Sequence, residues 1–276
     1  MADSLVIFDF DCTIAEVDSD PWVAQQLGAA HVMEDLRSHL PWNDMMDAVM
    51  ETLHAQGKSI QEIEEALRSI PLQPEKISAI KLAHALGCEL HIVSDANCFF
   101  IKTILDKYNV THLFSEIHTN PASVDVNGRL HIKPFHPKCE APHGCPLCPP
   151  NMCKGIVISD LQSEMAQDKR RIIYVGDGCG DFCPTLRLTE GDCVLPREDY
   201  PLLAMLMQSM PKVKASIYPW GTAKIMEETL VTLIETPTRL EEEHGFGGAC
   251  DENCAKCAMS SLEQVKEVVA RKPVYV

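Results

Sequence analysis

The sequence predicts an α/β fold, with a Rossmann-like parallel sheet as its core and a helical cap inserted after the first strand. Three short apolar runs indicate strands: Leu5–Phe8, Leu90–Val93 and Ile172–Val175. Continuous apolar runs of this length are typical of parallel strands buried on both faces. Each run ends in small or acidic residues, and open parallel sheets bind their ligands outside that end of the strands.

The helical stretch after the first strand is predicted to begin with Asp20 as N-cap and Pro21 at the first helical position. It continues to Gly87 with short breaks. The breaks are Pro41–Asn43, Gly57, the capping box Ser59–Glu62, and Pro71 with Pro74. An insertion here is expected to cover the ligand pocket and exclude water. We therefore assign residues 19–87 to a cap, and residues 1–18 with 88–236 to the core.

The second half of the chain is expected to alternate strands and helices. In order, we predict a strand ending at Ser94, helix 98–107, strand 116–119, hairpin 124–132, a loop 133–151, a helix carrying Lys154, strand 171–175, strand 193–196, helix 200–208, strand 215–218 and helix 222–235. The two-residue turn signal Asn127-Gly128 predicts the hairpin. Residues 237–276 follow as a cysteine-containing tail.

Composition and charge restrict the classes of partner. The 276 residues are 46% hydrophobic, enough to bury a substantial core. Forty acidic against 24 basic residues give a formal charge of −16, which argues against nucleic acid and anionic membranes as partners. No apolar run approaches the roughly 18 residues that span a bilayer. Because only four residues precede the first strand, we expect no secretory signal and a cytoplasmic location, with an organelle as the alternative.

Acidic and hydroxyl side chains follow all three predicted strands. The pairs are Asp9/Asp11, Ser94/Asp95 and Asp177/Asp181. Because the carboxyl ends of parallel strands meet at one edge of a sheet, these residues are expected to form one acidic, hydroxyl-lined pocket. Oxygen ligands of this kind suit Mg²⁺. The alternative is a strand that leads into a polar turn, with Asp11 and Thr13 as local hydrogen-bonding residues.

Four motifs in this order resemble those of the haloacid-dehalogenase-type phosphatases. Asp9-x-Asp11-x-Thr13 resembles the first family motif, and Ser94 resembles the second. Lys154 resembles the third, and Gly176–Asp181 resembles the fourth. The serine and the lysine are weak signals singly. The order and spacing of all four make the resemblance specific.

Within that superfamily, three segments resemble the phosphoethanolamine/phosphocholine phosphatase group: Asp18–Asp20, Ser94–Asn97 and Cys148–Gly155. The leading segment through Leu40–Asn43 is most similar to the plant branch, which contains phosphate-starvation-induced pyrophosphatase-like and thiamine monophosphate phosphatase-like proteins. The resemblance spans about residues 5 to 235 and does not include the tail.

The resemblance implies roles for the residues of the first three motifs. Asp9 would attack phosphorus and form an aspartyl-phosphate. Asp11 would protonate the leaving oxygen and then deprotonate the attacking water. Ser94 and Lys154 would hold the phosphoryl oxygens, and Thr13 is assigned to substrate binding.

The resemblance also implies a Mg²⁺ site. Asp9, Asp177 and the backbone carbonyl of Asp11 would hold the ion. Asp181 would support the metal through water or through Lys154. The alternative for Asp181 is a cap on the helix that follows it.

Thirteen cysteines in a chain without an expected export signal are predicted to be thiols or metal ligands rather than disulfides. The loop before the third motif contains a C-x₂-C pair that is a candidate for structural zinc; its ligands would come from Cys139, Cys145, Cys148, Cys153, His136 and His143. We favour the alternative, in which turns order this proline-rich loop and the loop places Lys154. In the tail, a second candidate set contains His244, Cys250, Cys254 and Cys257, and a solvated tail is favoured there.

The function expected from these features is Mg²⁺-dependent hydrolysis of small phosphate monoesters. Asp20 and Asp95 match positions of substrate contact in the family, with helix capping as the alternative for each. Two carboxylates there would attract a cationic group, so we expect a phosphorylated amine or thiamine monophosphate, with pyrophosphate as another candidate. The alternative function is a catalytically weak sensor or interaction protein that uses the cap and the tail. The sequence does not indicate an oligomeric state.

Overall fold

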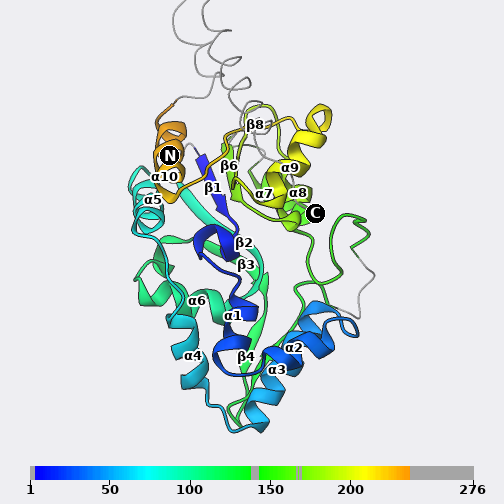
Figure 1. Cartoon of the computed structure of the whole chain (residues 1–276). Coiled ribbons are helices and arrows are strands. Elements are labelled where there is room, and N and C mark those ends of the chain that lie inside the picture. The colour runs from blue at the N-terminus through cyan, green and yellow to red at the C-terminus, as the bar shows by residue number, and fades with distance from the viewer. Residues whose placement is uncertain (1–3, 138–142, 166, 168–169, 237–276) are drawn as a thin grey trace, which may run out of the picture. The chain divides into compact units, whose positions relative to one another are not determined.

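A six-stranded parallel sheet with the order β3-β2-β1-β6-β7-β8 forms the centre of the protein (Figure 1). The structure is a computed structural model, and it describes residues 4–137, 143–165, 167 and 170–236. The strands are β1 (Ser4–Phe8), β2 (Glu89–Asn97), β3 (Glu116–Asn120), β6 (Arg171–Gly176), β7 (Cys193–Pro196) and β8 (Ser216–Ile217). The predicted α/β fold, with a parallel sheet and a helical segment after β1, is confirmed.

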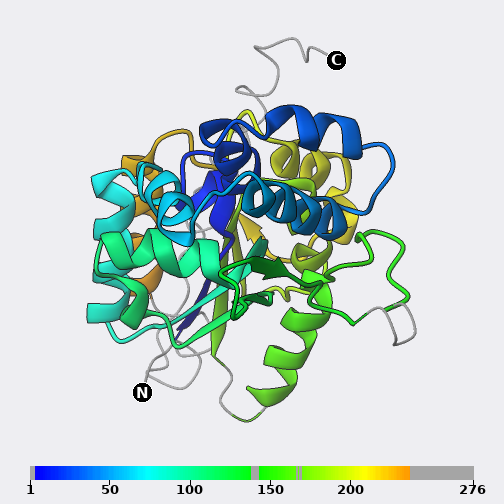
Figure 2. The same cartoon turned by 90° about the horizontal axis from the view of Figure 1, so that it is seen from below.

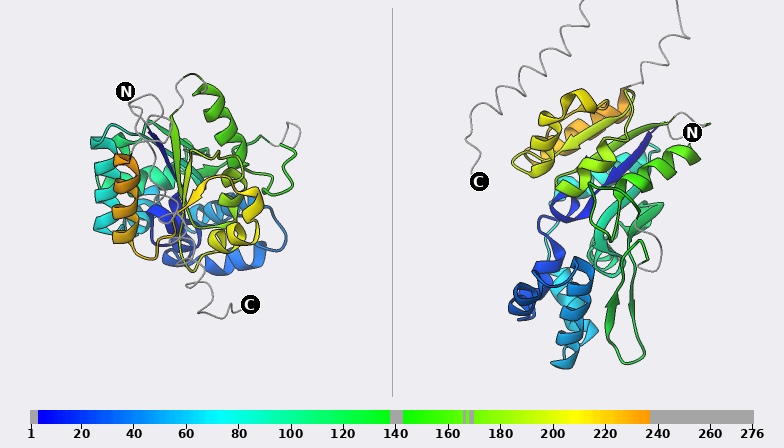
Figure 3. Two further views of the ribbon diagram at one scale, coloured as in Figure 1. Left: turned by 90° about the horizontal axis from the view of Figure 1, so that it is seen from above. Right: turned by 90° about the vertical axis from the view of Figure 1, so that its right-hand side faces the viewer.

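The side chains of strand β1 pack into the hydrophobic core on both faces of the sheet. Val6 and Phe8 pack in one hydrophobic cluster with helices α5 (Pro74–Ala85) and α10 (Ala223–Glu235). Leu5 and Ile7 pack in a second cluster with α7 (Lys154–Glu164) and α9 (Pro201–Gln208). Figure 3 shows α5 and α10 on one face of the sheet and α7 and α9 on the other. Burial on both faces explains why the run is continuously apolar.

The direction of the strand order reverses between β1 and β6. The chain moves outward from β1 to β2 and β3, then returns to β6 on the other side of β1 and moves outward again. The loops after β1 and β6 therefore leave in opposite directions. In open α/β sheets the ligand crevice lies at this point, outside the carboxyl ends of the strands.

The insertion between β1 and β2 is helical, as predicted. It begins with α1 (Ser19–Gln26), α2 (Ala30–Leu36), α3 (Trp42–Ala55) and α4 (Ile60–Arg68). These helices lie beyond the carboxyl end of β1, and they stand in front of the sheet when it is viewed from that end (Figure 2). Ser59 and Glu62 form the predicted capping box of α4. The turn after α3 requires glycine, because Gly57 has a φ of +82°.

The start of α1 differs from the prediction. Asp18, not Asp20, is the N-cap, and its Oδ1 accepts a hydrogen bond from the Asp20 amide at 3.1 Å. Asp20 and Pro21 lie inside the first turn of the helix. Asp18 precedes the helix in an extended conformation, so its side chain can accept from the free amides that follow it, whereas Asp20 already lies within the helix.

Two segments connect the insertion to the core. Helix α5, the last helix before β2, packs against α10. The antiparallel hairpin of β4 (Ala122–Val124) and β5 (Leu130–Ile132) packs against α3, where Asp47 accepts a hydrogen bond from the Ile132 amide at 2.9 Å. The hairpin was predicted, but its turn is longer than two residues, because the Asp125 amide donates to the Arg129 carbonyl and leaves residues 126–128 between them. Gly128 has a φ of +83°, as a three-residue turn of this kind requires.

Helix α6 (Cys98–Lys107) lies where it was predicted. The structure also contains the short helix α8 (Phe182–Thr185) and single turns at Thr111–Leu113 (η2), Cys179–Asp181 (η3) and Met210–Lys212 (η4), for which no ranges were predicted. None of the helices described here is both long enough and apolar enough to cross a bilayer.

Candidate active site

Asp9 lies directly after β1, at the point where the sheet order reverses. Its amide donates to the Val175 carbonyl of β6 at 2.9 Å, so the backbone of the neighbouring strand fixes its position. Its Oδ1 accepts from the Phe10 amide at 2.7 Å and lies 2.9 Å from the Lys154 ammonium. The Asp9 side chain is buried. The chain then turns sharply through Phe10–Ile14 (η1), with Cys12 in the left-handed region at a φ of +54°.

Lys154 is the buried cation of the site. Its ammonium lies 3.0 Å from Asp181 Oδ1 and 3.7 Å from Asp95 Oδ1, besides its contact with Asp9. Burial alone would lower the pKa of Lys154, but the carboxylates of Asp181 and Asp9 outweigh it and raise the pKa well above its usual value. The ammonium is therefore charged and positioned at the end of β1.

Asp181 is held by four hydrogen bonds. Oδ1 accepts from Lys154 and from the Tyr174 hydroxyl at 2.7 Å, and Oδ2 accepts from the amides of Asp177 and Gly178 at 3.0 Å each. Burial opposes its charge, but Lys154 and these hydrogen bonds lower the pKa of Asp181. The alternative that Asp181 caps the following helix with its side chain is wrong, because the carboxylate points back to the loop after β6.

The carboxylates of Asp9, Asp177 and Asp181 form a buried acidic group whose oxygens lie within 4.8 Å of one another. Thr13 is fully buried, and its hydroxyl donates to Asp177 Oδ1 at 2.9 Å. Burial and the Asp181 charge raise the pKa of Asp177 to about 7, and burial likewise raises the pKa of Asp9. Asp9 and Asp177, whose charged forms are disfavoured by burial, fit a divalent cation bound by oxygen ligands.

Asp11 lies apart from this group and faces the insertion. Its two carboxylate oxygens accept from the amide and the hydroxyl of Ser19, at 3.1 and 3.0 Å. Burial, followed by the charges of Asp18 and Asp20, raises the pKa of Asp11 well above its usual value. The raised pKa favours the protonated form of Asp11.

Ser94 lies near the end of β2, two residues beyond the register pair of Phe8 with Ile92. It is fully buried, and its hydroxyl oxygen accepts from the Ala96 amide at 3.3 Å. The serine is thus brought to the same edge of the sheet as Asp9.

A pocket of about 320 Å³ opens beside these residues. Its lining is largely acidic and consists of Asp11, Asp18, Asp20, Trp42, Asp95, Ala96, Pro149 and Asn151. The Trp42 indole donates to Asp20 Oδ2 at 2.6 Å, whereas the buried Asp20 Oδ1 has no hydrogen-bond partner among the described residues. Burial and the neighbouring Asp18 raise the pKa of Asp20 to about 8, and burial raises the pKa of Asp18 to about 6.

The capping alternatives for the two pocket carboxylates are both wrong. Asp18 caps α1 in place of Asp20, and Asn97 caps α6, where its Oδ1 accepts from the Phe100 amide at 3.0 Å. Asp95 is instead half-exposed, with its carboxylate toward Lys154. Neither Asp20 nor Asp95 therefore serves as the N-cap at the start of a helix.

Sequence reasoning missed several residues that complete the site. Trp42 was seen only as part of a helix break, and Tyr174 only as part of an apolar strand. Asn151 closes the far side of the pocket, and its amide donates to Asn43 of α3 at 2.9 Å. No local pattern marks Trp42 and Asn151, because each reaches the site from a distant part of the chain. Tyr174 is close in sequence to Asp181, but its strand is continuously apolar and gives no sign that its hydroxyl bonds that carboxylate.

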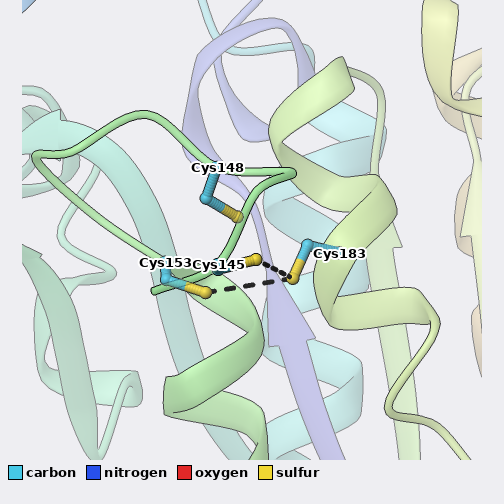
Figure 4. Close-up of side chains that lie close together, drawn as sticks. All are labelled: Cys145, Cys148, Cys153 and Cys183. Carbon is cyan, nitrogen blue, oxygen red and sulfur yellow. Dashed lines mark hydrogen bonds between the residues drawn. The ribbon is translucent and has the colours of Figure 1, made fainter. Parts of the chain in front are cut away.

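Four thiols converge beside the start of α7, and we call them the thiol cluster: Cys145, Cys148, Cys153 and Cys183 (Figure 4). The first three belong to the set considered from the sequence, and Cys183 was missed because it lies 30 residues further along the chain. His136 and His143 are outside the cluster. The predictions for Cys139 and for the cysteines of the tail fall outside the described residues.

Comparison with solved structures supports the fold. The chain is similar to a solved structure described as "Phospho-Aspartyl Intermediate Analogue of Phosphoserine phosphatase". The TM-score is 0.54 and the identity 15%, and the match covers 83% of this chain and 98% of that one. At this identity the likeness concerns the fold alone.

Sequence comparisons identify the family. The chain is 46% identical to "Inorganic pyrophosphatase 1" of Arabidopsis thaliana over 89% of this chain and 84% of that protein. It is 45% identical to "Thiamine phosphate phosphatase-like protein" of the same plant, over 88% and 100%. It is 34% identical to the human "Phosphoethanolamine/phosphocholine phosphatase", over 79% and 85%. The sequence model described as "Putative Phosphatase" matches residues 4–234. The chain therefore belongs to this family of haloacid-dehalogenase-type phosphatases, which hydrolyse small phosphate esters.

Proposed function

We propose that this phosphatase hydrolyses monoesters whose leaving group carries a positive charge, such as a phosphorylated amine or thiamine monophosphate. The observation that carries the proposal is the pocket near Lys154, whose lining contains Asp18, Asp20 and Asp95 as carboxylates that could attract a cation, besides Asp11, which would act as the acid. A cationic group gains attraction from such a lining, and a second phosphate group is repelled by it. The buried Asp20 Oδ1, which has no partner among the described residues, is the first candidate contact for the cation.

Trp42 adds a second means of recognition. Its indole holds Asp20 through one hydrogen bond, so the carboxylate is aimed before a ligand arrives. The ring also lines the pocket, and indole faces attract ammonium and other organic cations. Together, the aromatic ring and the carboxylates favour a compact cation over a neutral alcohol.

The buried acidic group fits Mg²⁺. Asp9 and Asp177, with the backbone carbonyl of Asp11, would hold the ion, and Asp181 would support it by fixing the loop after β6 and the Lys154 ammonium. Thr13 would orient Asp177 rather than contact the substrate, because its hydroxyl is buried against that carboxylate. When bound, Mg²⁺ supplies charge neutralisation between the phosphoryl oxygens and the attacking carboxylate.

In the first chemical step, a carboxylate oxygen of Asp9 attacks phosphorus while the bond from phosphorus to the ester oxygen breaks. Asp11 gives its proton to the departing oxygen, which leaves as an alcohol. Lys154 and Ser94 hold the phosphoryl oxygens in line for this displacement. The raised pKa of Asp11 supports the assignment, because it favours the protonated form that a general acid needs.

In the second step, water attacks the phosphorus of the aspartyl-phosphate. Asp11, now ionised, takes a proton from this water, and the bond from phosphorus to Asp9 breaks. Inorganic phosphate leaves, and both carboxyl groups return to their starting states.

The names of the relatives support a small phosphorylated substrate and disagree about which one. One plant relative is named for thiamine phosphate, and the human relative for phosphoethanolamine and phosphocholine. The plant relative at 46% identity is named for inorganic pyrophosphate, so pyrophosphate is the second candidate. The four carboxylates disfavour it, because its second phosphate group would lie among them unless another cation intervened.

Phosphate release with Mg²⁺ from a panel of substrates tests the proposal. The panel contains phosphoethanolamine, phosphocholine, thiamine monophosphate, pyridoxal phosphate, pyrophosphate and a neutral aryl phosphate. We expect kcat/KM for the best cationic ester to exceed that for pyrophosphate by at least about tenfold, which corresponds to about 1.4 kcal/mol. A preference for pyrophosphate or for the neutral ester would overturn the assignment of the pocket.

A further inference from the structure

We propose that the thiol cluster binds one structural zinc ion. In the structure, the four sulfur atoms lie within 4.8 Å of one another. The Sγ of Cys183 is 3.5 Å from that of Cys145 and 3.9 Å from that of Cys153. Figure 4 shows the side chains from the loop before α7 pointing toward Cys183 of α8.

These sulfur–sulfur distances fit tetrahedral coordination. Four thiolates about 2.3 Å from a zinc ion form a tetrahedron whose sulfur–sulfur edges are about 3.8 Å. The two distances above lie on either side of that value. A disulfide instead needs two sulfurs about 2.05 Å apart, and it would leave the other two thiols without a role. All four cysteines are free thiols in the structure.

The spacing and the surroundings of the ligands fit a structural site. Cys145 and Cys148 form a C-x₂-C pair, and Cys153 follows after four residues, which is within the spacing of closed zinc sites. Cys153 and Cys183 are buried, whereas the other two are half-buried, so the loop would cover the ion from the solvent side. Cys153 is also the N-cap residue of α7, so a ligand held there would lie directly at the start of the helix that carries Lys154.

The position of the cluster indicates what the ion would stabilise. Cys153 immediately precedes Lys154, and Cys183 follows Asp181 by two residues. One ion would therefore fasten together the two segments that form the 3.0 Å pair between Lys154 and Asp181. The packing is close here, because a Cβ on Gly155 would lie 2.5 Å from the Cys183 sulfur.

The same loop also contributes Pro149 and Asn151 to the wall of the substrate pocket. Residues 145–153 would then be ordered by zinc through their three cysteines and by the bond from Asn151, between the second and third of them, to Asn43. The predicted ordering of the loop by turns alone leaves the convergence of the Cys183 thiol unexplained. A structural ion accounts for both the convergence and the position of the loop.

Zinc content is the direct test. We expect about one zinc per chain in full-length protein prepared under reducing conditions with zinc present. The double variant Cys145→Ser/Cys148→Ser should retain less than about a fifth of that zinc, because two of four ligands are lost. Cys98→Ser is the matched control, since Cys98 is a half-buried thiol outside the cluster, bonded to Ala122. Equal zinc in the double variant and the control would overturn the proposal, and so would zinc-free wild-type protein.

Two further variants separate the cluster from the other cysteines. Cys139→Ser and Cys250→Ser/Cys254→Ser, both in the full-length chain, should keep the zinc of the wild type. Loss of zinc in either would assign the ion to a different ligand set.

If the double variant does not fold, cobalt exchange into wild-type protein tests the site instead. A thiolate-to-cobalt charge-transfer band that survives in both further variants supports the cluster, and its absence contradicts it. Iron in place of zinc, or a disulfide found by mass analysis, would also overturn the proposal.

The effect on activity rests on the proposed phosphatase chemistry and is measured separately. Zinc loss should lower kcat by about tenfold or more, because Lys154 is no longer held against Asp181. Asp9→Asn, which removes the nucleophile, should leave the zinc content unchanged. If zinc is bound but its removal leaves kcat unchanged, the ion does not position Lys154; if zinc is bound and no substrate is hydrolysed, only the proposed function fails.

Discussion

The acidic group and the thiol cluster are neighbours, because Cys153 of the cluster precedes Lys154, whose ammonium contacts Asp181 of the acidic group. They differ in their donor atoms and in the elements that carry them. The acidic group contains buried carboxylates from the ends of β1 and β6, whose positions the sheet fixes. The thiol cluster contains sulfur atoms from a loop and a short helix. Hard oxygen donors suit Mg²⁺, and soft thiolates suit zinc. Lys154 stands between them, next in sequence to Cys153 and in contact with Asp9.

The difference teaches that chemistry and positioning are separated in this molecule. The residues that would react lie on the rigid ends of central strands. The cysteines that would hold Lys154 in place lie on the loop before α7 and on the short helix α8, and no strand among the described residues orders that loop. A tightly bound zinc ion would therefore add order to the loop before α7, whereas the ends of β1 and β6 are already ordered by the sheet.

The largest effect is expected from Asp9→Asn. Loss of the nucleophile should reduce turnover by at least about 10³-fold on every substrate, because the amide cannot form the aspartyl-phosphate. Phosphate release gives the rate, and circular dichroism with zinc analysis shows whether the fold and the thiol cluster remain. A folded variant with near wild-type turnover would place the chemistry elsewhere.

Asp11→Asn should have the next largest effect. We expect a loss of about 10²- to 10⁴-fold on alkyl esters, because proton transfer to the leaving oxygen is lost. Aryl phosphates leave more readily without a proton, so their loss should be clearly smaller. Equal losses for the two classes of ester would mean that Asp11 acts through its hydrogen bonds to Ser19 and not as an acid.

Asp20→Asn should raise KM for a cationic ester by about 5- to 10-fold while changing KM for an aryl phosphate little. The substitution removes the charge and retains an oxygen that can accept from Trp42. Asp35→Asn, at an exposed position of α2, controls for the change in net charge. A uniform change across substrates would contradict a role in recognising the cation.

KM for the cationic ester should fall as the pH rises from about 6 to about 8, where Asp18 and then Asp20 lose their protons. The direction follows from the raised pKa values: below them the carboxyl groups are neutral and attract no cation, and above them they are charged. The ratio of KM values for cationic and neutral esters removes the titration of the phosphate itself. In Asp20→Asn, the upper part of this change should disappear; its persistence there would point to another group.

The smallest effect is expected from deletion of the tail after Glu241. Residues Met1–Thr236 form one compact unit, and the family match ends at residue 234. We therefore expect kcat/KM to stay within about twofold of the full-length value, since the site residues described above all belong to this unit. A larger loss, or loss of the zinc together with the tail, would assign the tail a part in one of the two sites.

The sequence alone determined the fold class and the residues at the sheet edge. Apolar runs such as Leu5–Phe8 must be buried on both faces, and the side chains that follow them must then meet at one edge. The order of the four motifs predicted that Asp9, Lys154 and Asp177 share a site, and the structure brings them together. Local capping signals were less reliable, because Asp18 and Asp20 are equally good caps and only the three-dimensional turn selects Asp18.

Only the tertiary structure decided which distant side chains share a site. Trp42 reaches Asp20 from another helix, and Cys183 reaches Cys153 across 30 residues of chain. Periodicity and motif spacing describe neighbours within an element, so they carry no information about such pairs. Contact between them depends on how the elements pack, and packing is fixed by the whole hydrophobic core rather than by any one segment.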